Sequence, residues 1–196
     1  MKKLKSIFNR FQPTDKLLQQ LKHSRNGDAL SALDALKERV AHKDGTLNEI
    51  DLSGASLSKA TLATADLEAI DFTGATLEHA YFHNANLQNA SFRNTRMTFA
   101  NLRGAKANNS NFENAILTQA NFARADLSDT NFQNANLNQA NFWETNFKGA
   151  NLTGATLVDA TLSDVRCDNR TILPDGTYWS EDTDWTRFTG NEDKHA

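Results

Sequence analysis

The sequence lacks several features that would narrow its function at once. Its 196 residues include a single cysteine, Cys167, so no intramolecular disulfide framework can form and a reducing cytoplasm is the expected location. No apolar run approaches the length that crosses a bilayer, and the basic start MKKLKSIFNRFQ is not followed by the roughly 7–15 apolar residues of a signal peptide. We therefore expect a soluble, cytoplasmic protein.

Motifs of catalysis are missing as well. The sequence contains no nucleophile motif, no phosphate-binding glycine loop and no zinc-ligand spacing. His79 and His83 lie near Glu78, but solvated surface residues are favoured over a metal site. Cys167 is interpreted as a small core residue and not as a reactive thiol. We expect no enzyme activity, no cofactor and no metal.

What the sequence has instead is a repeat of five residues. Leu or Phe stands at every fifth position from Leu52 to Leu162, with Met97 and Ala107 as exceptions, which makes 23 consecutive pentapeptides. A small residue, usually Ala, stands two positions before each centre. A helix would turn such a repeat through its whole circumference, whereas two residues two apart on an extended segment share a face. The repeat therefore predicts a solenoid whose three remaining residues turn a corner.

The number of sides follows from a longer period. The second residue after the centre tolerates positive φ in one series, namely Gly54, Gly74, Asn94, Asn114, Asn134 and Gly154. The series ten residues away, from Thr64 to Asp164, has no such rule, which indicates a period of twenty and four pentapeptides per coil. With coils about 4.8 Å apart, the repeats predict roughly six coils and a rod about 28 Å long. Phe columns are expected on two opposite walls and Leu columns on the other two.

The repeats ADLEA, ANLQN, ANFAR, ADLSD, ANLNQ and ANLTG strongly resemble the A(D/N)LXX motif of the pentapeptide repeat proteins. The resemblance covers about residues 46–165 and implies an all-β solenoid, a right-handed, four-sided parallel β-helix. Departures at the small position are Thr95, Ser110, Thr130 and Thr145. At the centre, Ala107 should leave a core gap that costs ~2 kcal/mol unless neighbours fill it.

Both ends of the chain have sequences suited to covering an open solenoid, whose strand edges would otherwise recruit other chains. After a basic flexible or amphipathic tail over residues 1–13, residues 14–45 are expected to form an N-terminal helical cap. The β-helix should occupy residues 46–165, and residues 166–196 a C-terminal cap and tail. In this cap we expect a lid of aromatic side chains, Tyr178, Trp179, Trp185 and Phe188. Capping at both ends slightly favours a monomer over a dimer.

Three groups of residues are candidates for binding. Aromatic and Arg side chains, the usual anchors of protein interfaces, gather on one wall: Tyr81, His83, Phe99, Arg103, Arg124 and Trp143. Scattered exposed aromatics are the alternative interpretation. A second group could contact an anionic membrane or a partner groove, although a frayed or capping tail is favoured: Lys2, Lys3, Leu4, Lys5, Ile7, Phe8, Arg10 and Phe11.

The third group is a basic belt in the middle coils. Arg93 and Arg96 are placed by the four-sided count at the corner opposite Arg103 and Lys106. One continuous groove for nucleic acid is therefore not expected. The preferred hypothesis is a non-enzymatic, protein-binding scaffold with an unknown partner. The resemblance offers an alternative, a protein that protects DNA gyrase by mimicking DNA, which would require a continuous acidic wall.

Overall fold

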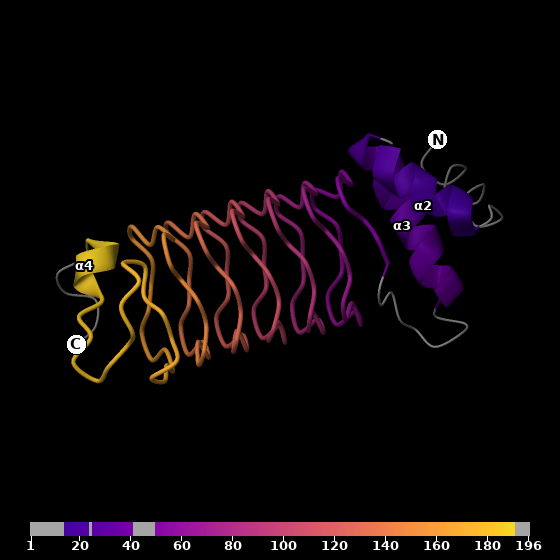
Figure 1. Ribbon diagram of the computed structural model, residues 1–196. Coiled ribbons are helices and arrows are strands. Elements are labelled where there is room, and N and C mark those ends of the chain that lie inside the picture. Colours follow the sequence, from indigo (N-terminus) through magenta and orange to yellow (C-terminus); the bar gives the residue numbers. More distant parts are fainter. Residues whose placement is uncertain (1–13, 24, 41–49, 191–196) are drawn as a thin grey trace.

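The computed structural model describes residues 14–23, 25–40 and 50–190 of the chain. Helices α2 (Thr14–His23) and α3 (Asn26–Val40) pack together at one end of a long rod of coils, and the short helix α4 (Thr186–Thr189) lies at the other end (Figure 1). Within the described ranges, no helix has the length and apolar character needed to cross a membrane. The basic tail at residues 1–13 lies outside the described residues.

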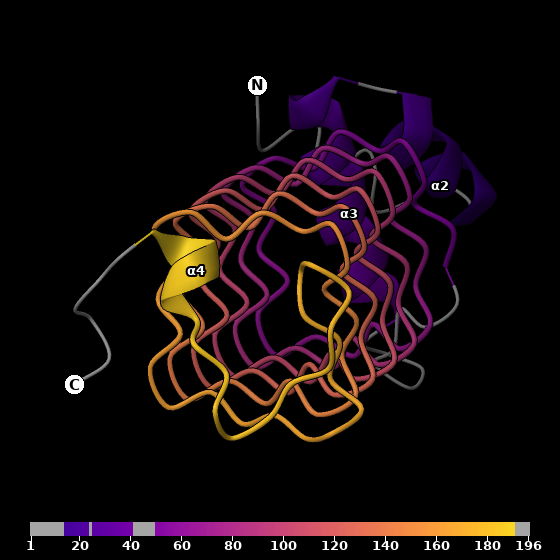
Figure 2. The same cartoon turned by 60° about the vertical axis from the view of Figure 1, so that its left-hand side comes forward.

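Each coil of the rod contains 20 residues arranged on four sides. Parallel β-bridges join residues 20 apart without interruption, from the Asp51–Asp71 pair to the Asn146–Arg166 pair. Each side contributes a single bridge residue, and the view from the C-terminal end has a four-sided outline (Figure 2). We number walls 1 to 4 by their first centres, which are Leu52, Leu57, Leu62 and Leu67. The predicted period of twenty and the four sides are confirmed.

Every corner is a hydrogen-bonded turn with the same backbone geometry. In the second coil, for example, the Ala75 N–H donates to the Phe72 C=O at 2.9 Å. The residue two after the centre has positive φ in all 23 repeats, and in 18 of these it is not glycine. Phe99, with φ of 60°, is one of them. A positive φ at the second central residue is typical of a type II turn.

The prediction that positive φ follows a rule on only one series of corners was therefore wrong, although the period inferred from it was right. A residue with a side chain loses about 1–2 kcal/mol in this conformation. The hydrogen bonds between coils impose it nonetheless, as when the Lys59 N–H donates to the Glu78 C=O at 2.8 Å. The corner geometry is thus set by the neighbouring coils and not by the identity of the corner residue.

The frequent Asp or Asn before each centre has a cause in the same turn. The Oδ1 atom of Asp71 accepts a hydrogen bond from the Thr73 N–H at 2.8 Å, and the same contact recurs along the rod. Such a contact gives the turn's otherwise unpaired N–H a partner. Bonds between coils also occur, for example from Asn86 Nδ2 to Asp66 Oδ1 at 2.8 Å. These side chains therefore also form bonds from coil to coil, as well as closing the turn.

The core is built from columns of aligned side chains. On wall 1 the rings of Phe72, Phe92, Phe112 and Phe132 stack with centroids 4.6–5.4 Å apart. Phe122 stacks on Phe142 at 5.3 Å on wall 3 and meets Phe112 edge-on at 5.8 Å. Phe147, on wall 4, is the exception to the predicted arrangement of Phe on two opposite walls.

The polar departures at the small position are satisfied within the core. Thr95 Oγ1 donates to the Phe92 C=O at 2.7 Å, and Thr130 Oγ1 donates to the Ala107 C=O at 3.0 Å. Both Thr side chains are fully or almost fully buried. Because each hydroxyl finds a carbonyl, replacing Ala by Thr does not leave an unpaired polar group inside the rod.

Segments at both ends contact the solenoid core. Leu21 of α2 and Leu33 of α3 belong to the same buried cluster as the first coil, and Asn26 Nδ2 donates to the Ser58 C=O at 3.1 Å. At the other end the Asp159 N–H donates to the Thr189 C=O at 2.9 Å.

The aromatic residues expected to form a lid do not act as one group. Trp185 and Phe188 pack against the core, whereas Tyr178 is 65% exposed and lies outside it. Leu173, which the sequence did not single out, is buried beside the last coil. Trp185, Phe188 and Leu173 therefore contribute apolar surface at this end, together with Val165 and Cys167.

Candidate protein-binding wall

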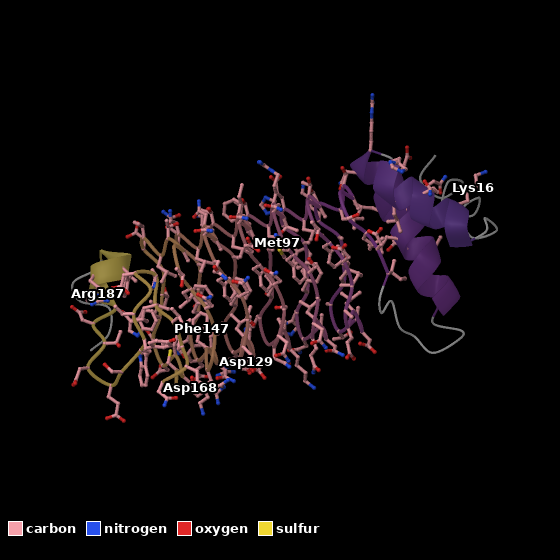
Figure 3. The ribbon with its side chains drawn as sticks, viewed as in Figure 1. Lys16, Met97, Asp129, Phe147, Asp168 and Arg187 are labelled. Carbon is pink, nitrogen blue, oxygen red and sulfur yellow. The ribbon has the colours of Figure 1, made fainter. Side chains whose placement is uncertain are left out.

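Wall 3 carries most of the predicted binding residues, one coil after another. Tyr81 belongs to the second coil, Arg103 to the third, Arg124 to the fourth and Trp143 to the fifth. Side chains project from the rod along its whole length (Figure 3). Tyr81 is 50% exposed, while its backbone is bridged on both sides, to Thr61 and to Asn101 in the adjacent coils. The wall therefore presents side chains from a backbone that is fixed in both directions.

Arg124 and Trp143 form a single unit on this wall. The Arg124 guanidinium lies 4.5 Å from the centroid of the Trp143 ring, and its Nε atom lies 2.7 Å from Glu144 Oε2. A cation–π contact and an ion pair together hold the guanidinium in place. Ala123, which also faces outward, is only 4% exposed.

The His83 ring forms a hydrogen bond with the backbone of the next coil on the same wall. Its Nδ1 atom lies 3.0 Å from the Arg103 C=O, and its Nε2 atom lies 3.1 Å from Asn84 Nδ2. A carbonyl can only accept, so His83 Nδ1 donates to the Arg103 C=O. His83 is therefore a bound element of the wall and not an open ligand.

Phe99 lies at the corner between walls 2 and 3. It is 48% exposed, and its ring stacks on that of His79 with centroids 4.8 Å apart and planes 7° from parallel. His79 and His83 are thus engaged with different partners. Within residues 14–23, 25–40 and 50–190, no three His, Cys, Asp or Glu side chains gather as a metal site would require.

Two family models match the repeats. A model described as a pentapeptide repeat region matches residues 66–142, and one described as pentapeptide repeats in eight copies matches residues 44–74 and 125–164. The chain belongs to the pentapeptide repeat family. No curated protein matches the sequence.

Several solved pentapeptide repeat proteins are similar to this member of the family. One from the thylakoid lumen of Arabidopsis thaliana is 28% identical, with a TM-score of 0.41. The match covers 59% of this chain and 66% of that protein, just under two thirds of its length. HetL from the cyanobacterium Nostoc sp. strain PCC 7120, involved in the regulation of heterocyst differentiation, is 22% identical over 68% of this chain and 89% of its own, with a TM-score of 0.34. QnrB1, a plasmid-mediated fluoroquinolone resistance protein, is 16% identical over 69% of this chain and 92% of its own, with a TM-score of 0.39.

The basic belt of this pentapeptide repeat protein is divided by its own ion pairs. Arg93 lies 3.2 Å from Glu113 on wall 1, and Arg96 lies 3.3 Å from Glu78 on wall 2. Arg103 extends from wall 3, and no carboxylate within the described residues pairs with it. Within the described residues, the belt therefore has two cations without an ion pair, Arg103 and Lys106, near the corner of walls 3 and 4, and neutralised pairs on walls 1 and 2.

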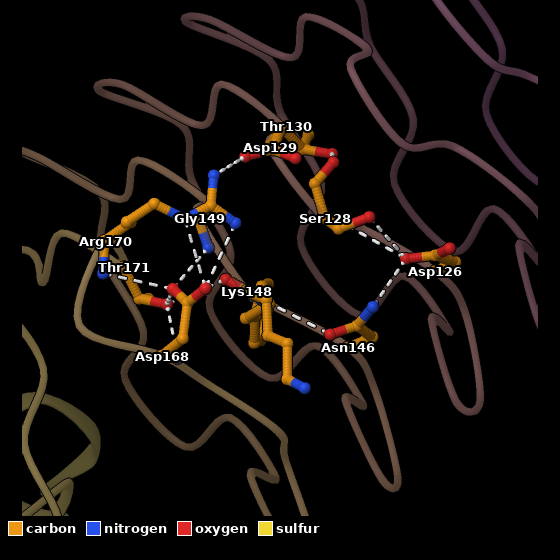
Figure 4. Close-up of polar contacts among 11 residues, drawn as sticks. Asp126, Ser128, Asp129, Thr130, Asn146, Lys148, Gly149, Asp168, Arg170 and Thr171 are labelled. Carbon is orange, nitrogen blue, oxygen red and sulfur yellow. Dashed lines mark hydrogen bonds and ion pairs between the residues drawn. The ribbon is translucent and has the colours of Figure 1, made fainter.

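A polar cluster on wall 4 was not foreseen from the sequence. Arg170 contacts Asp129 Oδ1 at 2.6 Å and Asp168 Oδ2 at 3.1 Å, and the Gly149 N–H donates to Asp168 Oδ1 at 2.9 Å (Figure 4). The cluster lies where the bridge spacing changes from 20 residues to 21, between Asn151 and its partner in the last coil. We infer that the cluster stabilises the last coil, since its contacts join three successive coils.

Its charges shift the acid titration of Asp168. Desolvation opposes the shift, but hydrogen bonds from the Gly149 and Arg170 N–H groups and from the Arg170 guanidinium hold the pKa of Asp168 below its usual range. Next to it, burial raises the pKa of Cys167 to about 12, against a smaller effect of the hydrogen bond with Thr171. Cys167 is half-buried against the core and, at neutral pH, holds its proton.

Proposed function

We propose that this pentapeptide repeat protein is a non-enzymatic scaffold in the cytoplasm, and that wall 3 binds another protein. The observation that supports this most is the placement of Tyr81, Arg103, Arg124 and Trp143 on wall 3 of four successive hydrogen-bonded coils. Tyr, Trp and Arg are the residues most often found at the energetic centre of interfaces. Because the backbone beneath them is already ordered, binding costs little conformational entropy.

The two ends have a supporting role in this proposal. We infer that helices α2 and α3, whose Leu21 and Leu33 belong to the core cluster, cap the first coil, and that the segment with Trp185 and Phe188, which pack against the core, caps the last. Capped ends cannot easily stack on other copies, because the strand edges are covered. We expect a monomer whose sides, and not its ends, are available to a partner.

The proposal is tested by affinity capture from a lysate of the source organism. The bait is the intact protein, and the test variant carries Trp143→Ala with Arg103→Ala. A matched control carries Gln133→Ala with Lys148→Ala, one residue on wall 1 and one on wall 4. A specific protein retained by the intact bait and the control, but lost from the test variant at unchanged Tm, supports wall 3. Equal capture by the test variant would remove wall 3 from consideration.

A version that lacks residues 1–12 is included in the same experiment. These residues include most of the basic and apolar side chains for which the sequence suggests contact with a membrane or a partner groove. Retention of the partner by this version assigns binding to the rod. Loss of the partner from this version alone would assign it to the tail.

The alternative function, protection of DNA gyrase by DNA mimicry, would need unneutralised acids along one wall. Three outward carboxylates, those of Glu78, Glu113 and Glu144, are instead paired with Arg side chains. These pairs support the scaffold over the mimic. A gyrase supercoiling assay with and without a quinolone separates the two, since only the mimic would restore supercoiling in the presence of the drug.

A further inference from the structure

We propose that the segment bound by wall 3 is an acidic, amphipathic α-helix lying along the axis of the rod. This inference rests on the proposed function, in which wall 3 is the binding face, and it adds the chemistry and shape of the partner. It draws on the charge of the wall and on the spacing of its coils.

Wall 3 differs from the other walls in charge. In its first four coils, from Thr61 to Arg124, the outward positions contain no Asp or Glu, although the whole chain has a formal net charge of −3. The carboxylates of those coils stand on the other walls: Asp51, Asp66, Glu68, Asp71, Glu78, Glu113, Asp126 and Asp129.

Wall 3 and its edge carry positive charges instead of carboxylates in these coils. Arg103 is exposed and has no ion-pair partner within the described residues, and the exposed Lys106 follows it just past the corner to wall 4. Arg124, with its side chain 50% exposed, has Glu144 as its ion-pair partner. Charge complementarity therefore favours a partner with carboxylates opposite the third coil, where Arg103 and Lys106 lie.

The spacing of the coils favours a helix over a strand. Neighbouring coils are separated by about 4.8 Å, as strands are, and a helix rises about 5.4 Å per turn, so successive turns meet successive coils. From Tyr81 to Trp143 there are three steps, about 14 Å along the rod against about 16 Å for three helical turns. An extended segment in the same direction repeats its face only every ~6.7 Å and falls out of register within two coils.

The order of side chains along the wall gives the partner a pattern. Tyr81 and the Arg124–Trp143 unit lie at the two ends of the contact, and Arg103 lies between them. The matching helix has an apolar residue near each end of one face and Asp or Glu between them, at positions three or four apart. Single-stranded nucleic acid is a poorer match because its bases would need stacking surfaces at closer intervals than the three coil-to-coil steps, about 14 Å, from Tyr81 to Trp143.

A random 16-residue peptide library displayed on phage tests the inference without knowledge of the natural partner. The full-length protein is the target, and the enriched peptides are synthesised and titrated by fluorescence anisotropy. Arg103→Glu is the test variant, and Lys148→Glu on wall 4 is its matched control, since neither residue is in an ion pair within the described residues. We expect acidic peptides with helical spacing, a loss of affinity of ~10-fold or more for Arg103→Glu and less than ~2-fold for Lys148→Glu.

Other outcomes would overturn the inference in distinguishable ways. Enriched peptides that depend on Trp143 but are neutral, basic or non-helical by circular dichroism when bound would refute the acidic helix and leave wall 3 as the binding face. No enriched peptide that depends on either Trp143 or Arg103 would refute the helix, and the lysate capture would then decide the proposed function separately. Tight binding of a 16-nucleotide single-stranded DNA, lost in Arg103→Glu, would reassign the wall to nucleic acid.

Discussion

Replacing Phe112 by Leu measures what the stack of aromatic rings contributes to the rod. Phe112 is fully buried, its ring lies 4.6 Å from that of Phe92 and 5.0 Å from that of Phe132, and it meets Phe122 edge-on at 5.8 Å. Each aromatic pair contributes about 0.5–1.5 kcal/mol beyond burial of its area, so three lost pairs amount to about 1.5–4.5 kcal/mol. Since Leu refills much of the space, we expect the free energy of unfolding to fall by about 3 kcal/mol.

The control for this experiment is Leu117→Met on wall 2 of the same coil. Leu117 is also fully buried, and a volume-conserving replacement there should cost less than about 1.5 kcal/mol. Both variants are unfolded in urea and followed by far-UV circular dichroism. Equal costs would refute the idea that stacking adds to burial. An unchanged m-value is required for the comparison, because a lower one would mean that the two halves of the solenoid unfold separately.

Three further predictions concern the corners and the last coil. Gly149→Ala should destabilise the rod more than Gly74→Ala. Both glycines have positive φ, but a Cβ at Gly149 would collide with Asp129 and Arg170, whereas a Cβ at Gly74 would face open space. The urea midpoints of the two variants check this. The depressed pKa of Asp168 predicts stability that is fully present above the ordinary carboxyl pKa and is lost as the pH falls through the lower folded-state value. The Tm of Asp168→Asn should thus depend less on pH in the acid range than that of the native protein. Cys167, with its pKa raised to about 12, should react with a thiol reagent at pH 8 far more slowly in the folded protein than in urea.

The repeat register was readable from the sequence because every coil repeats the same local pattern. Neighbours in space are 20 residues apart, so one uninterrupted series from Leu52 to Leu162 defines both the local turn and the contact between coils. The corner conformation was misread because it was inferred from the identity of the corner residues. Residue identity reports a preference for positive φ only where the residue is free to choose, and here Phe99 and Lys59 adopt it with φ of 60° and 66° because the adjoining coil requires it.

The composition of wall 3 could be predicted, but its internal contacts could not. The 20-residue period places Arg124 and Glu144 one coil apart, yet only the structure shows that the guanidinium also covers the Trp143 ring. The cluster of Arg170 with Asp129 and Asp168 was beyond the repeat pattern altogether. It depends on the extra residue in the last coil, which breaks the 20-residue spacing on which the prediction relied.

The separate roles of the positions within each pentapeptide decide how a loss of binding can be interpreted. The centre and the small residue before it are buried, and the backbone closes the turn and joins the coils, so these elements carry the stability of the rod. The side chains of Tyr81 and Arg103 are exposed and lie outside the core, and neither closes a turn as those of Asn121 and Asn141 on the same wall do. A change there should alter recognition and leave Tm within about 1–2 °C, because exposed positions typically change stability by less than ~0.5 kcal/mol. A wall variant that lost its partner and also melted several degrees lower would therefore indicate damage to the rod, whereas loss at unchanged Tm can only come from the surface itself.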